Sequence, residues 1–163
     1  MEYYKSICFE RGSKVLKVYG IIRLCAHHKS CATCGPPIGV YYSYDKAYKV
    51  LKKWKREHSW DKVDYMIKAY EVSGDSHPIN NTVYGVIRLC EQDHFGSAAP
   101  ADCGSMIGVY TSKEYAQSKI DQWVESHSWD ASNYVIRKLK IKGDRRRIVS
   151  NFYLPEKRYA LDI

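Results

Sequence analysis

The chain has 163 residues, of which 45% are hydrophobic, and its formal net charge is +8. This length permits one compact domain or two small ones, and no apolar run reaches the roughly 18 residues that a membrane-spanning helix needs. The positive charge favours an anionic partner, either an acidic protein or a nucleic acid.

Short strings of sequence occur twice along the chain. Residues 18–25 are VYGIIRLC and residues 83–90 are VYGVIRLC. The string IGVY occurs at 38–41 and 107–110, and the string HSWD occurs at 58–61 and 127–130. Identity at this level indicates two diverged copies of one unit, which we place at residues 15–75 and 82–144.

Each copy predicts the same elements in the same order. In the first copy, a β-rich run ends at Cys25, and a loop with Gly and Pro leads to a short strand at 38–41. Ser43 is a suitable N-cap for a helix that runs to about His58, and a last strand covers about 63–72. In the second copy, residues 112–127 repeat this helix and residues 133–141 repeat the last strand. The predicted unit is therefore β-β-α-β.

An apolar stripe runs along each predicted helix, because apolar residues recur at positions i, i+4 and i+7. Such a stripe has to lie on a sheet, so we expect the tryptophan in each of the two stripes to be buried. The stripes, each ending in a histidine, are Ala47, Leu51, Trp54 and His58, and Ala116, Ile120, Trp123 and His127.

These patterns predict an α+β fold. We expect two tandem β-β-α-β repeats related by a pseudo-two-fold axis, with a mainly antiparallel sheet and two helices. Residues 1–163 are expected to form a single compact domain, because the joint at 76–81 is only as long as a turn. Residues 3–9 and 145–154 are predicted to add one strand each.

A short signature accompanies the second strand and the helix of each copy. A hydrophobic residue is followed by Gly-Val-Tyr, one further residue and a serine, and then by a helix with Ala and Trp and by a strand. This signature resembles small uncharacterised modules found in prokaryotic and phage genomes. The resemblance transfers no functional residue, but it implies an accessory protein of a phage or mobile element that inhibits a host factor.

The cysteines are the most specific chemical feature. The first residues lack the apolar run of a signal peptide, so we expect a cytoplasmic protein, in a host cell if the protein is viral. Cysteines in that compartment are free or metal-bound more often than paired. Two cysteines two residues apart can reach one tetrahedral zinc ion, and the predicted zinc ligands are Cys25, His28 (or His27), Cys31 and Cys34. Disulfides, a four-cysteine site across the two copies, and unreactive buried thiols remain alternatives.

The repeated HSWD string is interpreted as structural. Adjacent residues at the end of a helix cannot all point at one reacting atom, as catalysis would require. His58 and His127 are expected at helix C-termini, where the helix dipole favours a cation. The tryptophans at 60 and 129 are expected to pack, and the following aspartates to hydrogen-bond into the turn.

The two copies differ most on the outward faces of their helices. The first helix presents Lys46, Lys49, Lys52, Lys53 and Arg56, whereas the second has Tyr115, Ser118, Asp121, Gln122 and Glu125 at the equivalent positions. A second basic group, Arg145, Arg146 and Arg147, follows the second copy. These eight cations are the predicted partner-binding residues; the alternative is an ordinary solvated lysine-rich face.

Three function classes fit these features. The first is a non-enzymatic binding module that recognises an acidic protein surface. The second is a nucleic-acid-binding protein that uses the basic helix and exposed tyrosines. The third is an enzyme with the Cys/His loop as its site, although the sequence has no phosphate-binding loop, dinucleotide fingerprint or catalytic motif.

Overall fold

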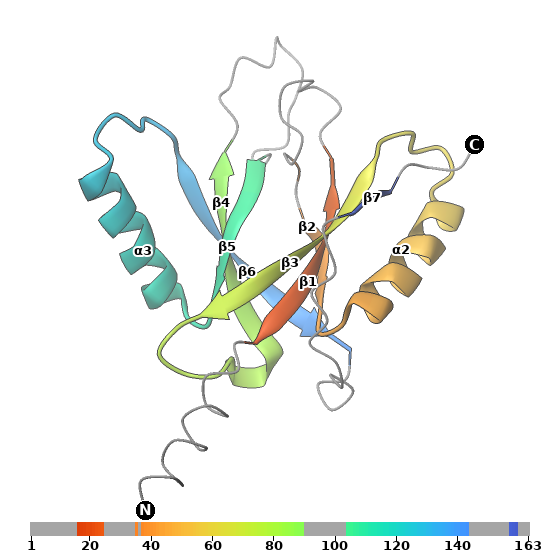
Figure 1. Ribbon diagram of the computed structural model, residues 1–163, viewed down its shortest axis with the longest axis horizontal. Helices are drawn as coiled ribbons and strands as arrows, with labels where there is room; N and C mark the ends of the chain where they lie inside the picture. The colour runs from red at the N-terminus through yellow and green to blue at the C-terminus, as the bar shows by residue number, and fades with distance from the viewer. Residues whose placement is uncertain (1–15, 25–34, 36, 90–103, 144–156, 160–163) are drawn as a thin grey trace, which may run out of the picture.

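The computed structural model describes residues 16–24, 35, 37–89, 104–143 and 157–159 (Figure 1). The elements of the first half of the chain are strand β1 (Lys17–Arg23), strand β2 (Pro37–Tyr41), helix α2 (Tyr44–Glu57) and strand β3 (Tyr65–Ser73).

The second half of the chain follows a short 3-10 turn, η1 (Ile79–Asn81). Its elements are strand β4 (Thr82–Leu89), strand β5 (Gly104–Tyr110), helix α3 (Lys113–Ser126) and strand β6 (Tyr134–Lys142), and a short strand, β7 (Lys157–Tyr159), comes last. The prediction of an α+β fold is confirmed, and the order β-β-α-β occurs once in each half.

Six strands form a closed ring of hydrogen-bonded neighbours, in the order β1, β2, β6, β4, β5, β3 and back to β1. Pairs within a half are antiparallel, and the two pairs that join the halves, β2–β6 and β3–β5, are parallel. The prediction of a mainly antiparallel sheet is confirmed. The closure was not predicted, because it depends on pairs between strands far apart in the sequence.

The two joins between the halves use corresponding residues. Val40 lies opposite Ile141 in β2–β6, and Val72 lies opposite Val109 in β3–β5. Val40 and Val109 are 69 positions apart, as are Val72 and Ile141. All four side chains are buried, so the residues that join the halves also belong to the core.

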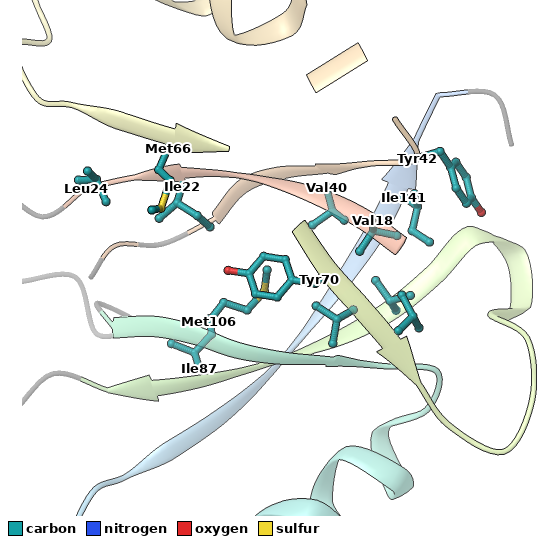
Figure 2. Packing of buried hydrophobic residues seen from close by; sticks show 13 residues of the cluster. Val18, Ile22, Leu24, Val40, Tyr42, Met66, Tyr70, Ile87, Met106 and Ile141 are labelled. Atoms are coloured by element: carbon teal, nitrogen blue, oxygen red, sulfur yellow. The ribbon is translucent and has the colours of Figure 1, made fainter. Parts of the chain in front are cut away.

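The main hydrophobic core lies between the halves and is built from both (Figure 2). Tyr70 and Met106 lie near its centre in Figure 2, with Ile22 above them and Ile87 below them. A Cβ on Gly20 would lie 3.1 Å from the Tyr70 ring, so glycine in β1 leaves room for that ring.

A second core cluster fills the space between α2 and the first-half strands. Ala47 and Leu51 contribute from the helix and Tyr65 and Ile67 from β3. In the second half, Ala116 is the one fully buried residue of α3. The predicted burial of the tryptophans is wrong: Trp54 is only partly buried, and Trp123 is 43% exposed, because both lie in the last turn of a helix.

The helix boundaries follow the predicted caps. The Ser43 hydroxyl accepts a hydrogen bond from the Lys46 backbone N–H at 3.2 Å, and the Ser112 hydroxyl accepts one from Tyr115 at 3.1 Å. His58 and His127 are the C-caps. Figure 1 shows the two helices on opposite outer sides of the strands, so their outward faces point in different directions.

Strand β7 was not predicted. It pairs antiparallel with β3 over residues 65–67, whereas the predicted strands at 3–9 and 145–154 lie outside the described residues. The joint contains Asn80 and Asn81 with φ of 53° and 55°, a left-handed conformation that asparagine tolerates. Among the described residues, no helix is long and apolar enough to cross a membrane.

Candidate interaction surface

The basic face of α2 consists of Lys46, Lys49, Lys52, Lys53 and Arg56, and all five residues are exposed. Its position follows from the helix period, because Ala47 and Leu51 are buried on the opposite side. The structure therefore brings together the five helix residues that the sequence predicts as a binding surface. The other three predicted residues, Arg145, Arg146 and Arg147, lie outside the described residues.

Few of these charges are neutralised within the described part of the chain. Lys53 pairs with Glu57 at 3.7 Å, and both side chains are exposed, so water and salt weaken this pair. Among the described residues, no carboxylate lies within ion-pair distance of Lys46, Lys49, Lys52 or Arg56. Within the described part of the chain, these four cations thus have no carboxylate partner.

Tyrosines border the basic face. Tyr44 and Tyr48 stack with ring centroids 6.2 Å apart, and the Lys52 ammonium lies 5.6 Å from the centre of the Tyr48 ring. Tyr48 is 37% exposed. An aromatic ring beside exposed lysine side chains can supply apolar contact area to an interface.

The corresponding face of α3 has a different character. Asp121, Gln122 and Glu125 are exposed, whereas Tyr115 and Ser118 are partly buried. The Gln117 side-chain amide donates to the Asp121 carboxylate at 2.9 Å, so one of the two carboxylates of this face already has a hydrogen-bond partner on α3. Two faces at equivalent positions in the chain therefore have opposite charge.

A buried carboxylate fixes the C-terminal end of α2. Asp61 accepts hydrogen bonds from Arg23 Nε at 2.8 Å and Nη2 at 3.0 Å, and from the Tyr65 hydroxyl at 2.5 Å. It also accepts from the Val63 backbone N–H at 3.2 Å, and Trp54 Nε1 donates to the Tyr65 oxygen at 3.0 Å. Both carboxylate oxygens are satisfied, so Asp61 holds β1, α2 and β3 in one arrangement.

The ionisation of this cluster follows from its contacts. Burial alone would raise the pKa of Asp61, but the hydrogen bonds from Arg23 and Tyr65 outweigh it, and the pKa is lowered. Burial, followed by the bond to Asp61, raises the pKa of Tyr65. Asp61 is therefore ionised and Tyr65 neutral at neutral pH.

Asp130 has the same position in the second half. It accepts hydrogen bonds from the Tyr134 hydroxyl and from Trp123 Nε1, the latter at 2.8 Å. Arg88 Nη2 lies 3.4 Å from Oδ1, but Arg88 Nε donates to Ser132 instead. Hydrogen bonds from Ser132, Tyr134 and Trp123 lower the pKa of Asp130. The prediction that both aspartates bond into their turns is confirmed.

Two surface tryptophans were wrongly expected to pack. Trp60 and Trp129 are each 73% exposed. Each makes an edge contact with the preceding histidine, at centroid distances of 5.9 and 5.7 Å, and that histidine stacks on a helix tryptophan. The recurrence of HSWD was the available signal, but it does not distinguish a packed ring from an exposed one.

The predicted zinc ligands Cys25, His28, Cys31 and Cys34 lie outside the described residues. Within the part of the chain that the structure describes, no group of three or more His, Cys, Asp or Glu residues is placed to hold a metal ion. The zinc hypothesis therefore stays a prediction.

Comparisons with family models, with curated proteins and with solved structures found no match to this chain.

Proposed function

We propose that this protein is a non-enzymatic binding module that recognises an acidic protein surface through the basic face of α2. Binding would block that surface of the partner. The protein would then act as an inhibitor that a phage or mobile element encodes against a host factor. The single observation that carries the proposal is the difference between the outward faces of α2 and α3.

We also infer that the two halves are tandem copies of one unit related by a pseudo-two-fold axis. The recurring element order and the corresponding registers of the two joins support this inference. If the halves are copies of one unit, α2 and α3 descend from one ancestral helix sequence. Exposed charges contribute only about 0–1 kcal/mol each to stability, so folding did not require one face to become basic and the other acidic.

An acidic partner fits the chemistry of the face. Lysine and arginine on a rigid helix attract a partner of opposite charge and speed up its encounter. Tyr48 at the border of the face, 37% exposed, supplies apolar area for the contact itself. We expect the association to weaken with increasing salt, since screening reduces attraction between exposed charges.

The experiment replaces Lys49, Lys52, Lys53 and Arg56 together by Glu. We expect the melting temperature to stay within a few degrees of wild type, because all four side chains are exposed, and we expect capture of the partner from native host extract to be lost. The control variant, Asp121→Lys with Glu125→Lys on α3, should keep capture. Full capture by the α2 variant would show that the basic face is only solvated.

Nucleic acid is the second candidate partner, favoured by the two exposed tryptophans on which bases could stack. Two measurements distinguish a protein partner from a nucleic-acid partner. Protein purified in low salt should show a ratio of absorbance at 260 to 280 nm typical of protein alone, and capture should survive nuclease treatment. A raised ratio and loss of capture with nuclease would favour nucleic acid.

A further inference from the structure

Strands β3 and β6 occupy equivalent places in the two halves, but their first residues have different neighbours. Residues 65–67 of β3 pair with β1 along one edge and with β7 along the other. Residues 134–136 of β6 pair with β4 along one edge. Within the described ranges, no strand lies along their other edge, since β2 pairs with β6 at residues 141 and 142. The start of β6 is therefore an open edge, whose backbone N–H and C=O groups can pair with a further strand.

The side chains along this edge are more exposed than their counterparts in β3. Met66 is 8% exposed, whereas Val135, at the equivalent position, is 36% exposed. The residues on either side of Met66 are 1% exposed or less, and those on either side of Val135 are partly exposed. The loss of burial thus falls on the three residues whose counterparts pair with β7.

Exposed apolar surface continues from the open edge onto α3. Asp130 connects the two, because it accepts hydrogen bonds from the Tyr134 hydroxyl and, at 2.8 Å, from Trp123 Nε1. Trp123 is 43% exposed, and Val124, which follows it, is 44% exposed. An unpaired strand edge bordered by exposed apolar side chains favours association with another protein chain.

The sequence of the edge is complementary to itself. In an antiparallel pair of β6 strands centred on Val135, this valine meets its own copy, and Tyr134 lies opposite Ile136. Aromatic and β-branched residues stabilise a sheet when they face each other across two strands. The cations at 137 and 138 would lie opposite the uncharged residues at 133 and 132, so no like charges meet. We propose that two copies of this chain form a dimer through this edge, with Val135 on the two-fold axis.

A second copy fits the edge better than a further strand of the same kind as β7. Each chain has one β7, and that strand is already paired with β3. It therefore covers one of the two equivalent edges and leaves the edge of β6 open. Antiparallel pairing of two β6 strands covers the open edges of both copies at once, so the association stops at the dimer.

The dimer goes beyond the proposed function and does not depend on it. Figure 1 shows α2 and α3 on opposite outer sides of the strands, and the dimer contact belongs to the second half. The basic face of α2 is therefore left exposed, and one dimer carries two such faces. Two linked faces bind a partner with two acidic sites more tightly than one face does.

The first test uses wild-type protein. We expect sedimentation to show a mass that rises from one chain to two as the protein concentration increases. Backbone amides of residues 134–136 should exchange their hydrogens more slowly at the higher concentration. Amides of residues 104–108 should show no change, because β5 lies on the far side of β4 from β6. This comparison needs no variant and therefore does not depend on how well a mutant folds.

Three variants test the position of the axis. Val135→Lys places two like charges opposite each other and should abolish the dimer over the same concentration range. Val135→Thr keeps a β-branched side chain in the strand and should keep the dimer. Ile107→Lys makes the lysine substitution at a residue of β5 that is 54% exposed, and it should keep the dimer as well.

Two results would overturn the proposal. One is a wild-type protein that stays monomeric at every concentration, whether the amides of residues 134–136 exchange rapidly or are protected by another part of the chain. The other is a dimer that survives Val135→Lys or forms without slower exchange at residues 134–136, because its contact would then lie elsewhere.

Discussion

The first and second halves of the molecule share the same caps and strand registers, but their helix–sheet interfaces are buried to different extents. Both have a serine N-cap, a histidine C-cap and an aspartate that bonds to a tyrosine four residues later. The helix–sheet interface of the first half is closed, with Leu51 1% exposed and Tyr65 fully buried. In the second half, Trp123 and Val124 are more than 40% exposed. A shared framework therefore constrains the caps and registers more strongly than the side chains that cover them.

The hydrogen-bonded groups around Asp61 and Asp130 also differ between the halves. Arg23 binds both oxygens of Asp61, whereas Arg88 is shared between Asp130 and Ser132. Strand β7 lies along β3 in the first half, and among the described residues no strand takes the equivalent place beside residues 134–136 of β6. The first half is thus the more tightly packed of the two, and it also presents the basic face.

The largest expected effect is the loss of stability when a truncated side chain leaves a cavity between a helix and the sheet. Leu51→Ala should cost about 2–5 kcal/mol of unfolding free energy, as for other fully buried leucines. Ile120→Ala should cost less than about half as much, because Ile120 at the equivalent position of α3 is only partly buried. Urea denaturation of both variants measures the difference. Equal losses would mean that the two helices are packed equally well.

A smaller difference is expected between the two aspartates. Asp61→Asn should cost about 2–4 kcal/mol, because it removes a charge that Arg23 and Tyr65 bind in a buried position. Asp130→Asn should cost less, since Arg88 keeps its bond to Ser132. Thermal melts at neutral pH check the order of the two effects, and a larger loss for Asp130→Asn would reverse the comparison.

The same pair gives a dependence on pH. The pKa of Asp61 is lowered by folding, so its contribution is complete above the unfolded-state pKa of about 3.9 and is lost as the pH falls through the folded-state value. The gap in stability between wild type and Asp61→Asn should therefore be constant near neutral pH and narrow below about pH 4. A gap that widened in acid would contradict this assignment.

Local sequence patterns predicted the helices and strands, but they could not predict contacts between residues far apart in the sequence. Ser43 and Ser112 could be recognised as caps because an N-cap depends on the residue itself and the next turn. Closure of the sheet depends on pairs such as Val40 with Ile141, which no local pattern encodes. The partner of Asp61 is Arg23, 38 residues away, so the sequence predicted the bond to the turn but not the ion pair.

The error over the tryptophans has a physical cause as well. Trp123 lies on the apolar stripe by helix period, but its indole N–H reaches Asp130 near the surface, which leaves the ring 43% exposed. Of the predicted binding residues, the five on α2 could be tested for exposure and are exposed. Exposure and charge follow from period and composition, whereas the identity of a partner does not.

Lysine footprinting of the captured complex tests directly whether the partner binds α2, as we propose, or α3. Lysines are acetylated in the free protein and in the complex, and the modified peptides are compared by mass spectrometry. We expect Lys46, Lys49, Lys52 and Lys53 to lose reactivity on binding, while Lys113 and Lys119 of α3 keep theirs. Protection of the α3 lysines with unchanged reactivity on α2 would contradict it.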